Sequence, residues 1–333
     1  MRVLVTGAAG FIGHAVSMAL MARGDSVLGV DNLNAYYDPA LKRARIRACE
    51  NERDGEWMFA ELDLSDSDGL NALCAKQRVE RVVHLGAQAG VRYSLENPQA
   101  YIQSNIVGHL NVLELARWHE IDHLVYASSS SVYGGNAKVP FAEDDRVDQP
   151  YSLYAATKKS DELLSESYSH LYRLPQSGLR FFTVYGPWGR PDMMPWIFTR
   201  KILAGDAIPV FNEGRMERDF TFIDDIVSGV IGVLDNPPPD DGSRKPGGSV
   251  SPHAIYNIGN NRSEPLLKVI DILAEACGRE AKLEMLPMQA GDVPRTFANI
   301  DALKEAVGYQ PTTPVEVGIP AFVEWFKTYH HLH

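Results

Sequence analysis

The sequence predicts an α/β fold, in which a doubly wound parallel sheet of the Rossmann type is followed by a smaller C-terminal substrate-binding lobe. Three observations lead to this prediction. A glycine-rich turn connects the first apolar strand to a helix, an acidic residue ends the second strand, and strand-like and helical segments alternate afterwards. Such alternation is what a parallel sheet covered by helices on both faces requires.

The first unit holds the most informative turn of the chain. A short apolar run, Arg2-Val3-Leu4-Val5, precedes it, and apolar residues at helical spacing follow from Phe11 onward. Between them, Thr6-Gly7-Ala8-Ala9-Gly10-Phe11-Ile12-Gly13 places three glycines where backbone angles closed to other residues let the main chain approach a pyrophosphate. The phosphate charge would face the free N–H groups of the helix N-terminus. The turn therefore predicts a dinucleotide site built on Gly7, Gly10 and Gly13.

The second strand, Ser26-Val27-Leu28-Gly29-Val30-Asp31, ends in an acid. An aspartate at this point accepts hydrogen bonds from a ribose 2′-hydroxyl and repels a 2′-phosphate. Asp31 therefore predicts NAD, in preference to NADP, as the cofactor. Strand, turn, helix and acid in this order favour a cofactor site over an ordinary strand–helix connection.

The remaining segments define two parts of the chain. Strand-like runs occupy residues 58–60, 81–85, 123–127 and 178–182, and helical patterning covers residues 70–76, 101–118 and 153–172. We assign residues 1–184 to an NAD-binding Rossmann domain, with elements near 220–260, at Phe220–Ile223 and Ala254–Ile258, returning to its sheet. Residues 185–333 are mainly the substrate-binding lobe, which is then discontinuous. Residues 236–252, rich in Pro, Gly and Ser, are expected to form a surface loop.

Composition argues against several classes of function. The formal net charge of -11 disfavours nucleic acid and anionic membranes as partners, because both require a basic surface. No apolar run is long enough to span a bilayer, and the opening residues have the pattern of a strand, not of a signal sequence. Cys49, Cys74 and Cys277 have neither disulfide nor zinc spacing and are expected to be packing residues. We expect a cytoplasmic protein without a metal site.

Two polar segments supply candidate catalytic groups. Ser128-Ser129-Ser130-Ser131 follows a predicted strand, at the edge of a parallel sheet where ligands bind. Tyr154 and Lys158, four residues apart in a predicted helix, share one face. A cation beside a phenol favours the phenolate, which near a hydroxyl-bearing carbon is a general base. These groups predict proton abstraction from an alcohol of the substrate.

With TGxxGxxG, a serine after the predicted strand at 123–127 and YxxxK, the chain resembles the extended short-chain dehydrogenase/reductase family nearly end to end. The resemblance implies a catalytic triad of Ser129, Tyr154 and Lys158. It places Asp63 and Leu64 near the adenine, and Gly86 where many relatives have alanine, a departure we expect to be mild. The NAD contacts that it implies are Gly7, Gly10, Phe11, Ile12, Gly13, Asp31, Asn32, Asp63, Leu64, Gln88, Asn105, Tyr154 and Lys158.

Within that family the chain is most similar to the nucleotide-sugar 4-epimerases, and by GVRYSLENP (90–98) and GPWGRPD (186–192) to those acting on UDP-glucuronate. The resemblance implies an isomerase that inverts C4 through a transient 4-keto sugar and forms UDP-galacturonate for surface polysaccharide. Dehydratases and decarboxylases of the family carry an acid directly after the catalytic Ser/Thr. Here Ser130 follows, which favours epimerisation. Relatives pair through helices matching 98–118 and 152–172, so a homodimer is expected.

Arginines are expected to bind the anionic UDP-sugar. Arg218 matches a diphosphate contact of the family, with Arg215 three residues before it. The segment around Asp292 resembles a ribose-binding segment, although Gln289 stands where some relatives carry arginine, which leaves Arg295 as a further candidate. Arg190 follows the strand that bears Thr183, so its guanidinium is expected to hold the sugar carboxylate in bidentate fashion, whereas a neutral hexose would leave it unpaired. The remaining predicted substrate contacts are Arg92, Ser130, Ser131 and Thr183.

Three alternatives remain open at this stage. The same chemistry on UDP-glucose or UDP-N-acetylglucosamine is the nearest of them. A dehydratase of the family would instead release a stable 4-keto-6-deoxy sugar. A non-enzymatic NAD-sensing module would tolerate the loss of Tyr154, which an epimerase would not.

Overall fold

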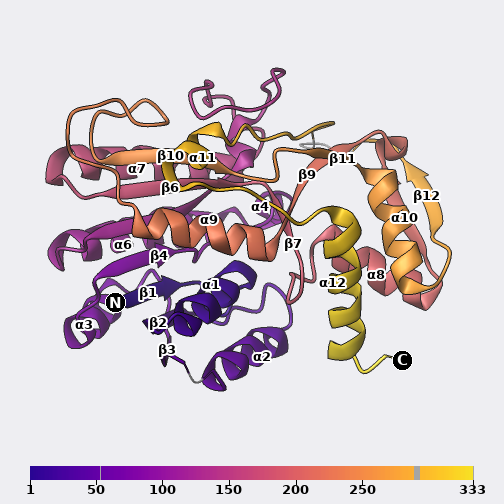
Figure 1. Cartoon of the computed structure of the whole chain (residues 1–333), viewed down its shortest axis with the longest axis horizontal. Coiled ribbons are helices and arrows are strands. Elements are labelled where there is room, and N and C mark those ends of the chain that lie inside the picture. The colour runs from indigo at the N-terminus through magenta and orange to yellow at the C-terminus, as the bar shows by residue number, and fades with distance from the viewer. Residues whose placement is uncertain (53, 289–292, 333) are drawn as a thin grey trace.

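The computed structural model describes residues 1–52, 54–288 and 293–332. Its largest element is a seven-stranded sheet in the order β10-β6-β5-β4-β1-β2-β3, in which every neighbouring pair is parallel (Figure 1). The predicted doubly wound parallel sheet is therefore confirmed. The strands are β1 (Arg2–Thr6), β2 (Ser26–Asp31), β3 (Glu56–Glu61), β4 (Arg81–His84), β5 (His123–Ser129), β6 (Gln176–Phe181) and β10 (His253–Ile258).

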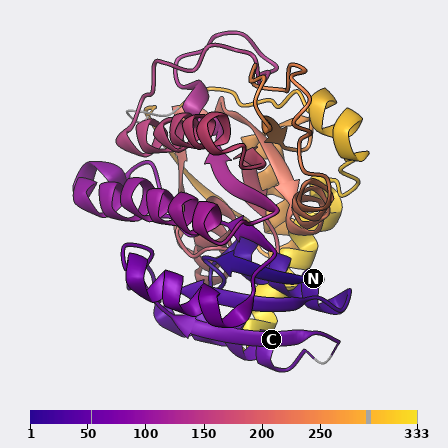
Figure 2. The same ribbon diagram turned by 90° about the vertical axis from the view of Figure 1, so that its left-hand side faces the viewer.

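Helices cover both faces of this sheet. Alternate residues of β1 point into two separate cores, with Val3 and Val5 in one and Leu4 in the other. The first core contains residues of α1 (Phe11–Ala22), α2 (Pro39–Glu50) and α9 (Ile223–Asp235), and the second contains residues of α3 (Ser67–Gln77), α6 (Gly108–Trp118) and α7 (Leu153–Tyr172). Figure 2 shows α6 and α7 side by side on one flank of the molecule. Cys49, Cys74 and Cys277 are free and buried.

The segment predicted as one helix over residues 101–118 is not a single α-helix. After α4 (Tyr93–Glu96), α5 (Pro98–Tyr101) leads into a π-helical turn, η1 (Ile102–Val107), and α6 begins at Gly108. A π-turn widens the helix by one residue without changing which residue types favour it, so the apolar pattern alone did not reveal it. Such turns are frequent at functional sites, and η1 carries Asn105.

The smaller lobe is built after the chain leaves β6. β7 (Thr183–Tyr185), β9 (Glu217–Phe222) and β11 (Ser263–Pro265) form one small sheet, and β8 (Ala207–Phe211) and β12 (Lys282–Leu286) form another. They pack with α8 (Met194–Ala204), α10 (Leu266–Cys277) and α12 (Val315–Tyr329), at the right of Figure 1. Two short 3-10 turns, η2 (Ser130–Tyr133) and η3 (Asn212–Gly214), and α11 (Asp301–Val307), which packs beside β10, complete the elements.

Of the two strand-like segments expected to return to the large sheet, one does so. β10 pairs with β6, whereas β9 pairs with β7 and β11 in the smaller lobe, and only the helix that follows it, α9, lies on the large sheet. The prediction for Phe220–Ile223 is therefore wrong in its strand, because an apolar run indicates burial but not the pairing partner. Residues 236–252 contain no helix or strand, as predicted for a loop.

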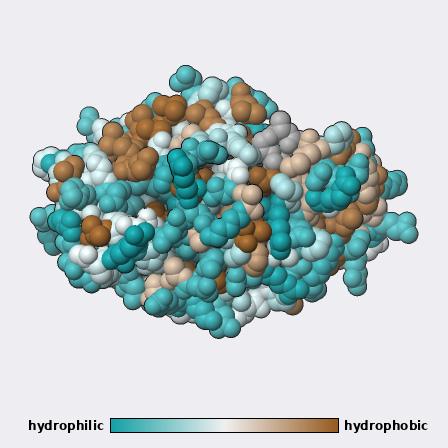
Figure 3. Space-filling view, turned by 90° about the horizontal axis from the view of Figure 1, so that it is seen from above, coloured by the Kyte–Doolittle hydropathy of each residue, from teal (hydrophilic) through white to brown (hydrophobic). Residues whose placement is uncertain are grey.

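The surface combines a polar background with local apolar areas (Figure 3). The face in Figure 3 is mostly hydrophilic, with separate apolar patches. Among the described residues, no helix has the length and apolar character needed to cross a bilayer.

Candidate active site

The glycine turn after β1 forms a cradle that side chains would block. Gly7 has φ of +67°, in the left-handed region, and a Cβ on it would lie 2.7 Å from a neighbouring backbone nitrogen. A Cβ on Gly13 would lie 2.1 Å from the Gly7 carbonyl oxygen. Gly10 is the N-cap of α1, and no side chain caps this helix, whose first turn begins with Phe11 and Ile12. Its N–H groups are left for an anion, so the cradle fits the pyrophosphate of a dinucleotide.

Gly86 lies directly beside this cradle. A Cβ there would lie 2.7 Å from the δ-methyl group of Leu64 and 3.1 Å from Thr6 Oγ1. The Leu64 methyl group therefore fills the space that the alanine methyl group of relatives would occupy. The Leu64 methyl group can move, but a Cβ would also lie 3.1 Å from the backbone nitrogen of Gly7, so the mildness of this departure stays a prediction. The contact of Leu64 with the adenine stays a prediction.

Asp31, at the carboxyl end of β2, is buried and has a cationic neighbour. Its Oδ1 accepts hydrogen bonds from the Leu33 N–H at 2.9 Å and from Lys42 Nζ at 3.3 Å. Next to it, Asn32 Nδ2 donates to Asp63 Oδ2 at 2.7 Å. The structure thus brings together the predicted cofactor contacts at the ends of β2 and β3, and it adds Lys42, which was not predicted.

Gln88 and Asn105 are held together against α7. Asn105 Oδ1 accepts the Gln88 N–H at 2.8 Å, while its Nδ2 donates to the Gln88 carbonyl at 3.1 Å and to Thr157 Oγ1 at 3.0 Å. The Thr157 hydroxyl in turn donates to the Tyr154 carbonyl at 2.8 Å. The π-helical turn therefore fixes the segment after β4 to the first turn of the helix that carries Tyr154 and Lys158.

The three predicted catalytic residues lie at one edge of the large sheet. Ser129 ends β5, and Tyr154 and Lys158 lie one turn apart near the start of α7, which packs against β5 and η2. Ser129 Oγ accepts the Ser131 N–H at 3.1 Å and donates to Ser131 Oγ at 3.0 Å. The Tyr154 ring meets Tyr101 edge-on at 6.1 Å between centroids. Among the described residues, no direct hydrogen bond joins Ser129, Tyr154 and Lys158 to one another.

Two oxygen atoms accept hydrogen bonds from the Lys158 ammonium group. Its Nζ donates to the Ala127 carbonyl and to Asp161 Oδ2, each at 3.0 Å, and both charged groups are buried. Burial raises the pKa of Asp161 to about 6, although the ammonium of Lys158 opposes this shift. Burial, with a smaller contribution from Lys158, lowers the pKa of His84 to about 3, so this nearby imidazole is neutral. The His84 imidazole therefore adds no positive charge beside Lys158.

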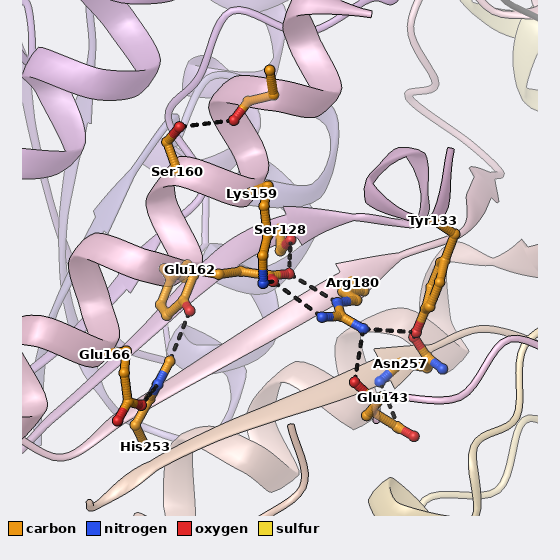
Figure 4. A network of polar contacts seen from close by, with 12 residues as sticks. Ser128, Tyr133, Glu143, Lys159, Ser160, Glu162, Glu166, Arg180, His253 and Asn257 are labelled. Atoms are coloured by element: carbon orange, nitrogen blue, oxygen red, sulfur yellow. Dashed lines mark hydrogen bonds and ion pairs between the residues drawn. The ribbon is translucent and has the colours of Figure 1, made fainter. Parts of the chain in front are cut away.

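A buried polar network supports the serine turn (Figure 4). Ser128 Oγ donates to Glu162 Oε1 at 2.6 Å, and Arg180 donates to both oxygens of Glu162, at 2.8 and 3.0 Å. Arg180 also donates to the Tyr133 hydroxyl at 3.0 Å, which donates to Asn257 Oδ1 of β10 at 2.6 Å. Burial raises the pKa of Glu162, but the Arg180 guanidinium outweighs it and lowers the value to about 2. The Glu162 carboxylate is thus ionised, and both of its oxygens accept hydrogen bonds.

Arg190 already has a carboxylate partner. Its Nε donates to Asp192 Oδ1 at 3.0 Å and its Nη2 donates to Asp192 Oδ2, which also accepts the Tyr36 hydroxyl at 3.0 Å. The expectation that a neutral hexose would leave Arg190 unpaired is therefore wrong, because Asp192, two residues along the chain, pairs with it. Nη1 of Arg190 has no hydrogen bond to any described residue and is the edge left for a ligand.

The predicted contacts to the rest of the nucleotide lie in the smaller lobe. Arg215 and Arg295 line one cavity of about 300 Å³, each paired with a carboxylate, Glu213 and Glu217 respectively. Arg218, in the same strand as Glu217, donates to the Pro294 carbonyl at 3.2 Å. Asp292 lies outside the described residues. Arg92 is exposed and its guanidinium lies over the Phe211 ring, 5.5 Å from the centroid. Ser130 and Ser131, which begin η2, and Thr183 in β7 are half-buried.

A dinucleotide cradle, an acid for the ribose and a Ser–Tyr–Lys set at one sheet edge define a class of enzyme that moves hydride at an alcohol carbon. The chain belongs to the NAD dependent epimerase/dehydratase family, whose model matches residues 3–259. The predicted family and the predicted cofactor, NAD, are confirmed. Among the described residues, no group of His, Cys, Asp and Glu side chains is placed to hold a metal ion.

The chain is also similar to individual enzymes of this family. UDP-glucuronate 4-epimerase 1 of Arabidopsis thaliana is 49% identical over 98% of this chain and 77% of its own length. The crystal structure of UDP-glucuronic acid 4-epimerase from Bacillus cereus with UDP-glucuronic acid and NAD is 31% identical, covers 99% of this chain and 100% of that one, and has a TM-score of 0.88. A Thermotoga maritima UDP-glucose 4-epimerase with UDP-glucose is 29% identical over 99% and 100%, with a TM-score of 0.85. The fold is thus common to enzymes named for two different sugars.

Sequence reasoning missed several residues that the structure brings to the site. Lys42 and Arg45 lie on the buried face of α2, and Asp192 and Tyr36 hold Arg190. A signal was present for the first two: in Leu41-Lys42-Arg43-Ala44-Arg45, two basic residues occupy the same helical face as the apolar Leu41 and Cys49. Asp192 lies two residues after Arg190, whereas for Tyr36 no local pattern exists, since its contact with Asp192 joins residues 156 positions apart.

Proposed function

We propose that this protein is an NAD-dependent UDP-glucuronate 4-epimerase, which forms UDP-galacturonate as a precursor of surface polysaccharide. The observation that carries the proposal is Arg190, a guanidinium oriented by Asp192 along one edge, with Nη1 free of partners among the described residues. A planar guanidinium held in this way favours a carboxylate over a neutral hydroxymethyl group. The similarity to the Arabidopsis and Bacillus cereus enzymes supports the same substrate.

The chain's own residues then have defined tasks. Bound NAD supplies a hydride acceptor that later returns the hydride. Tyr154 takes the proton of the 4-hydroxyl group and gives it back, Ser129 donates a hydrogen bond to the same oxygen, and Lys158 favours the phenolate. Arg190, with Ser130, Ser131 and Thr183, holds the carboxylate while the 4-keto ring turns over. C4 is inverted without net oxidation.

Elimination of water is not supported by the carboxylates near the serine turn. A dehydratase requires a second proton-transfer group, and Ser130 and Ser131 occupy the positions after Ser129. Glu162 lies close to this turn but is ionised and bonded to Arg180 and Ser128. This supports a reaction in which hydride leaves C4 for the cofactor and returns to the same carbon.

The second candidate is the same epimerisation of UDP-glucose or UDP-N-acetylglucosamine. The observation that favours it is the pairing of Arg190 with Asp192, because a neutral sugar would then leave no unpaired buried cation. Turnover of the three UDP-sugars without added reductant, followed by separation of the products, distinguishes the candidates. UDP-galacturonate as the preferred product supports our proposal, and faster inversion of a neutral UDP-sugar overturns it.

We also propose that two copies of the chain pair through α6 and α7. Apolar side chains on the outer surface of these helices and the segment before them are exposed, notably Leu163 at 61% and Leu171 at 62%. Exposed apolar residues gathered on two neighbouring helices favour a protein partner, and the homodimer expected from the family resemblance makes a second copy of this chain our choice of partner. Leu163→Glu should shift the mass in solution from dimer to monomer. A monomeric parent protein would contradict the pairing.

A further inference from the structure

Arg45 is a fully buried arginine that no part of the proposed chemistry uses. It lies in α2 with no exposed surface, facing away from solvent together with Leu41 and Cys49. Its Nη1 donates to the Ala9 carbonyl at 3.0 Å and to the Tyr37 hydroxyl at 2.7 Å. Its Nη2 donates to the Trp188 carbonyl at 2.5 Å and to the Gly189 carbonyl at 3.3 Å.

The two sets of carbonyls belong to different halves of the site. Ala9 lies inside the glycine turn that is built for the dinucleotide, between Gly7 and Gly10. Trp188 and Gly189 directly precede Arg190, the residue that we assign to the sugar carboxylate. One planar side chain therefore connects the cofactor turn, 36 residues before it, to the sugar-binding segment, 143 residues after it.

The segment held by Arg45 has little freedom of its own. Trp188 has φ of +64°, which is uncommon for a bulky residue. Its ring packs on His14 of α1 at 5.2 Å and on Trp325 of α12 at 5.3 Å, between centroids. The backbone between β7 and Arg190 is thus held by the Arg45 guanidinium on one side and by the packing of the Trp188 ring on the other.

The charge of Arg45 has no carboxylate partner among the described residues. Its hydrogen bonds all go to carbonyl oxygens and one hydroxyl group. Burial lowers the pKa of this guanidinium, with the Tyr37 hydroxyl and, at longer range, the Asp31 carboxylate opposing the shift. A buried charge without a directly bonded counter-ion is costly, so stability alone is a poor reason for an arginine at this place.

We propose that Arg45 is a positioning residue that couples occupancy of the NAD site to the position of the segment carrying Arg190. The inference rests on the proposed function in one respect, namely that Arg190 faces the sugar. Because coupling between two binding sites is reciprocal, a bound UDP-sugar must then slow the release of NAD, and the effect must pass through Arg45.

The test measures NAD release instead of turnover. The rate at which NAD leaves the purified holoenzyme is followed by rapid filtration, without ligand and with saturating UDP-glucuronate or UDP-glucose. In the parent protein we expect the sugar nucleotide to slow release by about tenfold, within the usual range of such coupling. Arg45→Lys keeps the charge, but an ammonium lacks the planar fork that reaches both carbonyl sets. The ratio of the NAD release rate without sugar nucleotide to the rate with it should therefore fall to about one in this variant.

Neighbouring arginines of the same helix provide matched controls. Arg43 and Arg47 are exposed in α2, so Arg43→Lys and Arg47→Lys should leave the ratio unchanged. Arg45→Met, which also removes the charge, should lose the coupling as Arg45→Lys does. If Arg45→Met does not fold, the ratio of release rates in Arg45→Lys tests the positioning role by itself.

The outcomes separate the inference from the proposed function. An Arg45→Lys protein that retains the parent ratio overturns the positioning role, and so does a parent whose NAD release responds to neither sugar nucleotide. Coupling in the parent that appears only with UDP-glucose, and is lost in Arg45→Lys, supports the role of Arg45 while contradicting the preference for UDP-glucuronate.

Discussion

Replacement of Arg190 by alanine is the sharpest test of the sugar-binding geometry. The guanidinium lies along Asp192, with Nη1 left for the ligand, and its side chain is 22% exposed. Removing it deletes the group proposed to hold the substrate carboxylate. It also leaves Asp192, whose pKa burial raises but Arg190 holds below the usual range, as an unpaired anion beside the same ligand group. Both changes disfavour a uronate.

The magnitude follows from the hydrogen bonds lost. A hydrogen bond to a charged group contributes about 1.5–3 kcal/mol. Because Arg190 retains some exposure to water, we take the lower end for two such bonds, a total of about 3 kcal/mol, or on the order of a hundredfold in Kd. A neutral UDP-sugar lacks the carboxylate, so its Kd should change by less than about threefold.

A second effect concerns the product. The 4-ketone formed beside C5 and its carboxylate is a β-keto acid, which loses carbon dioxide once the C5–C6 bond aligns with the carbonyl π system. Arg190 is expected to keep that bond out of alignment, an orientation effect that prevents a reaction. Arg190→Ala should therefore raise the fraction of turnovers that end in a UDP-4-keto-pentose, with the cofactor left reduced.

Titration calorimetry with UDP-glucuronate and UDP-glucose, together with mass analysis of products, measures both effects. The double variant Arg190→Ala with Asp192→Asn is the matched control, because it removes the leftover anion and should recover part of the lost affinity. A single variant that binds UDP-glucuronate as tightly as the parent and epimerises it cleanly would refute the reasoning and remove Arg190 from the mechanism.

Three further predictions concern the catalytic base, the cofactor and the buried network. Tyr154→Phe should keep NAD content near normal while turnover falls by on the order of a hundredfold or more, since the titrating oxygen is lost; comparable turnover would exclude Tyr154 as the base and favour an NAD-sensing module. Asp31→Ala should loosen the preference for NAD over NADP in a binding titration, because the ribose acceptor disappears and Lys42, 3.3 Å from it in the parent, is left without its anion; an unchanged preference counts against the assignment. Glu162, with a folded pKa of about 2 against 4.5 for an unperturbed glutamate, contributes stability that is fully present above pH 4.5 and is lost as pH falls toward 2. In acid titrations of unfolding free energy, Glu162→Gln should remove about 3 kcal/mol of the total stability that the parent loses in acid, while destabilising the protein at neutral pH by about 3–5 kcal/mol because Arg180 is left buried without its partner; a parent-like loss of stability in acid by the variant would contradict the pairing.

The sequence by itself determined the large sheet, the cofactor and the family. Each depends on residue types at short, fixed spacings: glycines in one turn, an acid at the end of the next strand, and Tyr154 and Lys158 one helical turn apart. Such patterns act locally through backbone angles and helix geometry, so they are readable before any tertiary contact is known.

Other features of the site were decided only by tertiary structure. The π-helical turn at Asn105, the pairing of β9 within the smaller lobe and the contact of Tyr36 with Asp192 leave no local signature. Arg45 shows why most clearly: its carbonyl partners lie 36 and 143 residues away, and nothing in α2 specifies which backbone will arrive there. These segments come together because the burial of apolar side chains in the cores requires it. A buried donor such as the Arg45 guanidinium then bonds to the backbone acceptors that this packing places next to it.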